Sequence, residues 1–401
     1  MAIVVTAVAT RRSGVRTSPQ TPAIAAAPPV VDASLPWFSP ALGSDASVPD
    51  GAARMQHGTA RRTHRAHALG PKAIQVGWKA KVDGPVAAQV TSSSDEATLY
   101  VATLGGDLIA LNRANGERRW TIKLGDRAYA SPLVADDGTI WAGTDAKKIF
   151  AIAPSGNVVH RIDVDGEADT SPALANDGTI VIAAGTQVLS IRRGGDIAWR
   201  FTARGKVFTA PAVTSEGLVV VGSQDDGVYA IAANGTLAWR VDLGADVDGA
   251  AAIGDDGAIY VGTDGAEIVR IDPAGKIAWR APAGGFVRGG LTVGRNGDVL
   301  AGTYGPVPRL VRFGPDGQPR GAFPISGTGA REFGIHGGPL EDDEGALYFG
   351  AQDDAAYALA PDGTVRWRFE TGADVDAPLT LLTDGSLVVP SEDGSVTLLV
   401  P

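Results

Sequence analysis

The chain has 401 residues, carries 35 Lys and Arg against 45 Asp and Glu for a net charge of −10, and contains no cysteine. The lack of cysteine excludes a disulfide scaffold, a thiolate metal site and a thiol nucleophile within this sequence. The acidic balance argues against a nucleic-acid partner, because phosphates would be repelled. No apolar run approaches the ~20 residues of a membrane-spanning helix.

The N-terminal part differs in composition from the rest of the chain. Residues 1–50 are rich in Ala, Pro, Ser and Thr, which is typical of a disordered leader or linker. Arg11 and Arg12 follow the short apolar run of residues 2–9 instead of preceding it, so the sequence predicts no export signal. Residues 51–73 contain several arginines and histidines, and we expect a basic N-terminal arm there.

From residue 74 to 401 the sequence repeats with a period of roughly 40 residues, which indicates a solenoid, a propeller or another array. Residues 230–239 read AIAANGTLAW, residues 270–279 read RIDPAGKIAW, and residues 358–367 read ALAPDGTVRW. In each segment a Gly lies five residues after the start and a Trp four residues after that Gly.

One repeat, residues 171–207, contains four short apolar runs separated by turn residues. Asn176-Asp177-Gly178 is a tight-turn signal, and the runs of four to six residues suit strands better than helices. The sequence therefore predicts a four-stranded antiparallel meander in each repeat. The same inner turn recurs at Gly138, Gly217, Gly257, Gly297, Gly345 and Gly385.

The two ends of the repeat region complement each other. The last repeat ends one strand short after residues 396–400, and residues 74–82 (IQVGWKAKV) read as the missing outer strand, with Trp78 at the usual Trp position. Pairing them would leave no open edge, and meanders can stack around an axis. We therefore predict an all-β fold, an eight-bladed β-propeller over residues 74–401 whose last blade is completed by an N-terminal strand.

Residues 110–120, ALNRANGERRW, resemble the repeat signature of the pyrroloquinoline-quinone-type (PQQ-like) β-propeller family. The resemblance covers roughly four-fifths of the chain and implies that each Trp packs against the neighbouring blade. Two repeats depart from it, with His160 and Gly321-Ala322-Phe323 in the Trp position, and we expect His160 to be a packing substitute. The Trp residues expected to be structural are Trp78, Trp120, Trp199, Trp239, Trp279 and Trp367.

A candidate site follows from one register of the repeat. The residue nine positions after each Trp, and the residue two before it, should precede the innermost strands and surround one mouth of the axial channel. These positions carry carboxylates, cations, aromatic rings and a histidine, although solvated loop residues are the simpler interpretation. The candidate ligand- or partner-binding residues are Arg127, Tyr129, Glu167, Asp169, Lys206, Phe208, Asp246, Asp248, Phe286, Arg288, His336, Asp374 and Asp376.

The sequence predicts neither a catalytic residue nor a metal site. It has no phosphate-binding loop, no His-Glu-x-x-His motif and no Gly-x-Ser-x-Gly elbow. Asp246 with Asp248, and Asp374 with Asp376, could offer oxygen ligands to calcium, but they lack EF-hand spacing.

Three functions stay open at this point. The resemblance favours a non-enzymatic binding or scaffold propeller, close to the outer-membrane assembly lipoprotein branch, with a protein partner, no cofactor and a periplasmic or extracellular location. A PQQ-dependent dehydrogenase is the enzymatic alternative, although its cysteine pair is missing and every repeat is near minimal length. A module that senses a peptide or a carbohydrate is the third. We expect a monomer that neither spans a membrane nor binds nucleic acid.

Overall fold

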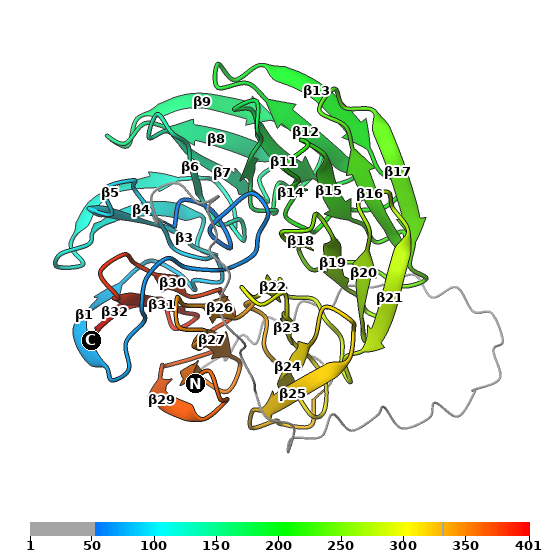
Figure 1. Cartoon of the computed structure of the whole chain (residues 1–401). Helices are drawn as coiled ribbons and strands as arrows, with labels where there is room; N and C mark the ends of the chain where they lie inside the picture. Colours follow the sequence, from blue (N-terminus) through cyan, green and yellow to red (C-terminus); the bar gives the residue numbers. More distant parts are fainter. Residues whose placement is uncertain (1–52, 331–332) are drawn as a thin grey trace, which may run out of the picture.

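The computed structural model describes residues 53–330 and 333–401, so the predicted leader, residues 1–50, lies outside the described residues. Every regular element in this part is a strand, and the strands form eight four-stranded antiparallel sheets arranged as blades around a central axis (Figure 1). The prediction of an eight-bladed propeller is confirmed. No helix among the described residues is long and apolar enough to cross a membrane.

Blades are numbered here by their innermost strand, and each meander runs from the axis outward. Blades 1 to 4 comprise β2(Thr91–Ser92), β3(Thr98–Ala102), β4(Asp107–Asn112), β5(Arg118–Lys123); β6(Leu133–Val134), β7(Ile140–Thr144), β8(Lys148–Ile152), β9(Val158–Asp163); β10(Ala173–Leu174), β11(Ile180–Ala184), β12(Gln187–Ile191), β13(Ile197–Thr202); and β14(Ala212–Val213), β15(Val219–Gly222), β16(Gly227–Ile231), β17(Leu237–Asp242).

Blades 5 to 8 comprise β18(Ala252–Ile253), β19(Ile259–Gly262), β20(Glu267–Ile271), β21(Ile277–Pro282); β22(Thr292–Val293), β23(Val299–Gly302), β24(Arg309–Phe313), β25(Pro319–Pro324); β26(Leu340–Glu341), β27(Leu347–Ala351), β28(Ala355–Leu359), β29(Val365–Glu370); and β30(Thr380–Leu381), β31(Leu387–Ser391), β32(Ser395–Val400) with β1(Gln75–Lys81).

The ring closes through the two ends of the repeat region. Strand β1 pairs antiparallel with β32, with Trp78 opposite Leu398 and Ala80 opposite Val396. In Figure 1 the blue strand β1 lies beside the red strand β32 and the C-terminus. The predicted N-terminal strand thus completes blade 8. It takes the place of the fourth, outer strand, so that β32 is paired on both of its edges.

The predicted inner turns are present, and glycine is required in them. Gly138 has a φ of +80°, a backbone conformation that side chains with a Cβ rarely adopt, and its amide donates to the carbonyl of Ala135 at 2.9 Å. Asp137 supports the same turn by accepting a hydrogen bond from the amide of Thr139 at 3.0 Å. These turns bring the first and second strands of each blade together.

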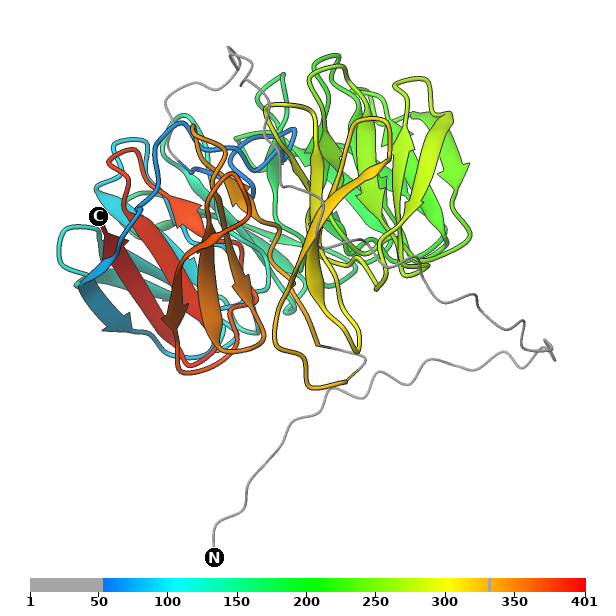
Figure 2. The same cartoon turned by 60° about the horizontal axis from the view of Figure 1, so that its bottom comes forward.

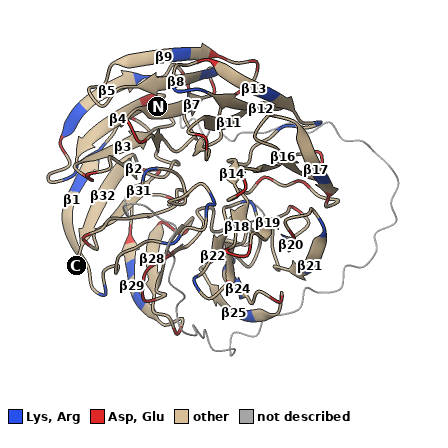
Figure 3. Cartoon of the chain, turned by 45° about the horizontal axis from the view of Figure 1, so that its top comes forward, with Lys and Arg blue, Asp and Glu red and all other residues tan. Residues whose placement is uncertain are grey.

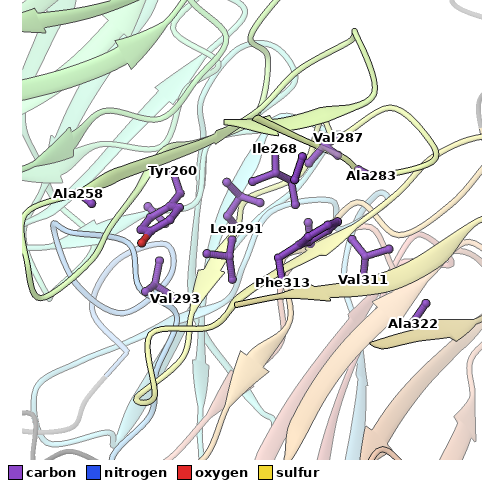
Figure 4. Packing of buried hydrophobic residues seen from close by; sticks show 14 residues of the cluster. Ala258, Tyr260, Ile268, Ala283, Val287, Leu291, Val293, Val311, Phe313 and Ala322 are labelled. Carbon is purple, nitrogen blue, oxygen red and sulfur yellow. The ribbon is translucent and has the colours of Figure 1, made fainter. Parts of the chain in front are cut away.

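The hydrophobic core consists of layers between neighbouring blades. Between blades 5 and 6, for example, Tyr260 and Ile268 face Leu291, Val311 and Phe313, and all five are almost fully buried (Figure 4). Alternate residues of each strand point to opposite faces of its sheet, so each blade contributes to two such layers. A single blade could not bury both faces alone, which explains why the fold needs the full ring.

The Gly and Trp of the repeat signature meet across the blade boundary. The indole of Trp239 in blade 4 donates to the carbonyl of Pro273 in blade 5 at 3.2 Å, and its ring lies against Gly275. A Cβ on Gly275 would approach the ring to 2.7 Å, closer than van der Waals contact allows. The ring of Trp78 lies against Gly116 in the same way and joins blade 8 to blade 1.

In two blades another residue stands in the Trp position of this contact, as the sequence predicts. His160 lies opposite Ala151, the place that Trp takes in most other blades, and its ring packs against Gly195 of blade 3. Gly321 takes the Trp position of blade 6, opposite Arg312. There the neighbouring Arg320 and Arg312 both bind the fully buried carboxylate of Asp298, each at 2.6 Å.

Residues 53–73, called the arm below, cross one face of the ring (Figure 2). The amides of innermost strands donate to arm carbonyls: Val134 to Arg54 at 2.7 Å, Val213 to Ala60 at 2.8 Å, and Ile253 to Arg61 at 2.9 Å. The basic residues of the arm pair with carboxylates of the inner turns, as in Arg54 with Asp136 at 2.7 Å. This contact explains why a basic segment precedes an acidic repeat region.

Arg62 anchors the arm at the centre of the channel. Its side chain is fully buried and donates to the carbonyls of Pro211 at 2.7 Å, Ser171 at 2.9 Å and Gln56 at 3.1 Å. Burial lowers the pKa of Arg62 to about 9, so the guanidinium still carries its charge at neutral pH. The arm therefore holds blades 3 and 4 together from within the channel.

Candidate functional site

The predicted site residues lie in the loops that enter the innermost strands, on the face opposite the arm. This set and the second row described below are called the open mouth. In each loop a buried apolar residue, such as Val247 or Val287, separates two side chains that face the solvent or the channel. In the irregular blade 7, Ile335 takes the same place, so His336 falls into register as predicted.

A second row of side chains at this mouth was not predicted. It follows the second strand of each blade, and each backbone amide donates to a carbonyl of the first row: Asp145 to Arg127 at 3.0 Å, and Asp264 to Asp246 at 2.9 Å. The signal was available, because these residues come after a Gly-Thr, Gly-Ser or similar pair at the same repeat spacing. The second-row residues used below are Asp145, Gln224, Asp264, Tyr304, Gln352 and Glu392.

The two rows interlock between blades. The guanidinium of Arg288 in blade 6 donates from Nε and Nη2 to both carboxylate oxygens of Asp264 in blade 5, at 2.8 and 2.7 Å. Such a two-pronged pair fixes both side chains in one plane. Gln224 reaches Asp248 at 3.4 Å across the preceding blade boundary, so blades 4, 5 and 6 share one polar surface.

Blades 6, 7 and 8 are linked through His336. The ring of His336 stands edge-on to that of Tyr304, with 5.6 Å between their centres, and its Nδ1 lies 3.9 Å from Asp376. Gln352 also donates to Asp376, at 3.2 Å. Loss of water disfavours the charged imidazole, but the Asp376 carboxylate outweighs this effect and the pKa of His336 is raised.

Cations cover three of the aromatic rings predicted for this site. The charged groups of Arg127, Lys206 and Arg288 lie over the rings of Tyr129, Phe208 and Phe286, at 5.7, 5.6 and 5.3 Å from the ring centres. Each pair comes from one loop, two residues apart, so the side chains share one face of the backbone. Lys206 also lies 3.7 Å from Glu167 of the preceding blade.

Carboxylates crowd together at two places in the open mouth. Burial raises the pKa of Asp246 to about 6, with repulsion from Asp248, Asp226 and Asp264 adding to the effect. Burial likewise raises the pKa of Asp374 to about 7, helped by Asp376 and Glu392. Both groups thus hold their protons far more tightly than an ordinary aspartate, and a cation beside either cluster would relieve the repulsion within it.

The crowded carboxylates do not form a metal centre of recognisable geometry. Within residues 53–330 and 333–401, no three His, Cys, Asp or Glu side chains are placed so that they could hold a metal ion. The described residues of the open mouth offer paired charges and partly covered aromatic rings.

Comparison with known proteins identifies the family. The family model described as "Outer membrane protein assembly factor BamB" matches residues 62–167, 145–233 and 224–305, together more than half of the chain. The chain belongs to this PQQ-like propeller family. The match to the family begins within the arm and ends in blade 6, so it includes the open-mouth residues from Arg127 to Arg288 and leaves out His336, Asp374 and Asp376.

A solved structure of the same family name has the same fold. The crystal structure of BamB from Moraxella catarrhalis superimposes with a TM-score of 0.66, over 82% of this chain and 97% of that chain, at 16% sequence identity. No curated protein matches the sequence. At this identity the likeness shows that the fold is common to both, and the site residues must be argued from the present chain alone.

Proposed function

We propose that this protein is a non-enzymatic scaffold that takes part in outer-membrane protein assembly and binds a protein partner at its open mouth. The observation that carries the proposal is the two-row ring of charged and aromatic side chains, held in place by contacts between blades such as Arg288 with Asp264. A surface that is fixed before binding loses little side-chain entropy when a partner docks.

The charges of the open mouth favour a polar, partly cationic protein surface as the partner. Burial and repulsion from neighbouring carboxylates raise the pKa values of Asp246 and Asp374, so a lysine or arginine from a partner would gain from docking there. Arg127 and Lys206 on the other blades would take acidic groups of the same partner. Complementary charge of this kind sets the orientation and the specificity of a complex.

Carbohydrate sensing is less well supported by the geometry. A sugar ring binds an aromatic side chain by lying flat on its face, but Arg127, Lys206 and Arg288 already cover one face of the rings of Tyr129, Phe208 and Phe286. Tyr129 is the most open of the three and is 41% exposed. The aromatic rings therefore serve better as rigid contact area for a protein.

The family supports the cellular setting of the proposal. The matching model is described as an outer membrane protein assembly factor, and the similar solved structure is a protein of that name. We infer for this chain an extracytoplasmic location facing the outer membrane, with a component of its assembly machinery as the partner.

The double variant Arg288→Ala/Asp248→Asn tests the proposal. Both side chains lie at the open mouth, and removing them should lower the affinity for the partner by about 10- to 100-fold, in the range of buried charge pairs at an interface. The matched control is Arg200→Ala/Asp177→Asn, which removes one cation and one carboxylate from exposed positions outside the mouth. Unchanged binding by the first variant in an affinity measurement with the isolated partner would refute the proposed site.

A further inference from the structure

The arm carries a pair of histidines deep inside the channel. The rings of His57 and His64 are stacked, with 4.4 Å between their centres and 22° between their planes. Each residue is 1% exposed, and none of their four ring nitrogens makes a hydrogen bond of good geometry in the described part of the chain, although carbonyls of Gly338, Pro339 and Leu379 lie close to the His64 ring. Buried polar atoms without partners are rare in folded proteins, so this pair calls for an explanation.

The histidines lie close to the floor of the open mouth. A Cβ on Gly290 would meet Cε1 of His57 at 1.7 Å, and a Cβ on Gly338 would lie 3.4 Å from the same atom. Gly290 and Gly338 follow Arg288 and His336 of the open mouth by two residues. The histidine pair of the arm therefore lies next to the loops that carry Arg288 and His336 of the open mouth.

The surroundings of the pair offer nothing that would stabilise a positive charge strongly. Burial, then repulsion from a charged His64 and from Arg62 of the arm, lower the pKa of His57. Gln89, which precedes β2, accepts a hydrogen bond from the His57 backbone amide at 2.8 Å, not from its ring. Carbonyls of Gly338, Pro339 and Leu379, before β26 and β30, favour a charged His64, but burial outweighs them.

We propose that His57 and His64 form a pH-sensitive latch, which keeps the arm in the channel while both rings are neutral and releases it when they are protonated. Two cations 4.4 Å apart beside the buried Arg62 have no counter-ion in this environment, so protonation favours a state in which the arm is exposed to water. Release of the arm would free the innermost-strand amides that now donate to its carbonyls, such as those of Val134, Val213 and Ile253.

The sign and the pH window follow from the histidine pKa values. Burial lowers the pKa of His64 to about 4 and lowers that of His57 well below its ordinary value, whereas a released arm would titrate near 6.5. The released state thus binds more protons, and the docked state weakens as the pH falls below about 6.5. For His64 the expected loss at pH 5 is about 30-fold, and His57 adds a further loss in the same direction.

Protonation of Asp136 or Glu341, two carboxylates near the arm, would not weaken its docking between pH 7 and 5. The pKa of Asp136 is lowered by Arg54, so that ion pair fails only at a pH well below 5. Burial raises the pKa of Glu341, which accepts a hydrogen bond from the amide of Arg295; a group with a raised pKa favours the docked state more as the pH falls. The arm also pairs Arg61 and Arg65 with Asp255 and places His67 3.9 Å from Asp343. These groups are unchanged in the double Asn variant described below, so the difference between that variant and the parent reports on His57 and His64.

Hydrogen exchange on the intact chain tests the latch. The amides of Ala66, Val213 and Ile253 bind across the arm contact, and their protection, corrected for intrinsic exchange, should fall by at least about 30-fold from pH 7.5 to 5. Amides within β15 and β16 should keep their protection. The variant His57→Asn/His64→Asn removes both titrating rings, and Asn suits the positive φ of 57° and 55° at these positions. Its arm protection should not depend on pH.

The control variant His160→Gln removes a histidine from the outer strand β9 and should retain the full pH dependence. Constant arm protection in the parent protein, or an equal loss in the double Asn variant, would overturn the latch. Should the double variant fail to fold, imidazole NMR signals of the parent decide the matter. The latch requires both His57 and His64 to titrate below pH 5 while docked, and ordinary titration near 6.5 would refute it.

Discussion

At the scale of single residues, one contact repeated around the ring explains most of the sequence signature. A ring on the outer strand of one blade lies against a glycine in a turn of the next, as Trp239 lies against Gly275 and His160 against Gly195. The glycine serves two purposes, because it adopts a positive φ and leaves room for the ring. The Gly and Trp of the repeat signature are therefore explained by packing between blades, and they give little information about binding.

Replacing one of these glycines should destabilise the fold by more than the strain of its positive φ alone would. Gly275→Ala should lower the free energy of unfolding by roughly 2–4 kcal/mol, because the new methyl group would press on the Trp239 ring. Gly244 has a similar φ of +76° and nothing within 4 Å, so Gly244→Ala should cost only about 1 kcal/mol. Denaturant unfolding compares the two, and equal losses would contradict the packing role of the glycine.

The crowded carboxylates of the open mouth should make stability depend on pH. The pKa of Asp374 is raised to about 7, so the folded state holds a proton that the unfolded chain releases near pH 4. Stability therefore falls as the pH rises from about 4 to 7. Asp374→Asn should be more stable than the parent by roughly 1 kcal/mol at pH 8, after allowance for solvent screening, and equal to it at pH 4. The same difference in stability between variant and parent at both pH values would contradict a raised pKa for Asp374.

At the scale of elements, the closing strand is what turns eight meanders into one ring. Strand β1 lies more than 300 residues before its partner β32 in the sequence, yet the register Ala80 to Val396 is well defined. Contacts at this separation form late and are costly in loop entropy, so the closing pair should be a weak point until it is complete.

A disulfide between the closing strands tests that register. The chain has no native cysteine, so Ala80→Cys/Val396→Cys introduces a single pair at directly opposite positions. The oxidised protein should gain about 2–4 kcal/mol of stability, which a reductant would remove. In Lys79→Cys/Val396→Cys the side chains point to opposite faces of the sheet, and no bond should form. A bond in the second pair and not in the first would mean that the register is shifted.

The elements that repeat could be predicted from the sequence, and those that do not repeat could not. Glycine turns and Trp spacing predict the blades, and Trp78 at the usual position identifies the closing strand. The path of the arm has no such signal, because Arg62 and His64 adopt positive φ without being glycine, and Arg62 binds carbonyls that are far apart in the sequence. The second row at the open mouth, such as Asp264, lay in the repeat but needed the folded blades to bring it beside Arg288.

At the scale of the whole molecule, the two ends of the channel differ in kind. One end is crossed by the arm, whose arginines pair with acidic turns, and the other presents the two rows of the open mouth. Figure 3 shows that many Lys and Arg residues lie on the outer strands, where they pair with nearby carboxylates, as Arg240 does with Asp225 at 3.5 Å. The outer strands also expose single apolar residues such as Val159, whereas the side chains of the open mouth are joined by contacts between blades, which is why we propose the open mouth as the surface for a partner.

Site-specific photo-cross-linking measures this asymmetry directly. The cross-linking residue is placed at Tyr129 in the open mouth, at Val159 on the outer wall, or at Leu69 in the arm, all of which are exposed by 41–51%. The proposal of a binding face at the open mouth predicts an adduct with the partner from position 129 and none from positions 159 and 69. Adducts from position 69 or 159 without one from 129 would contradict it.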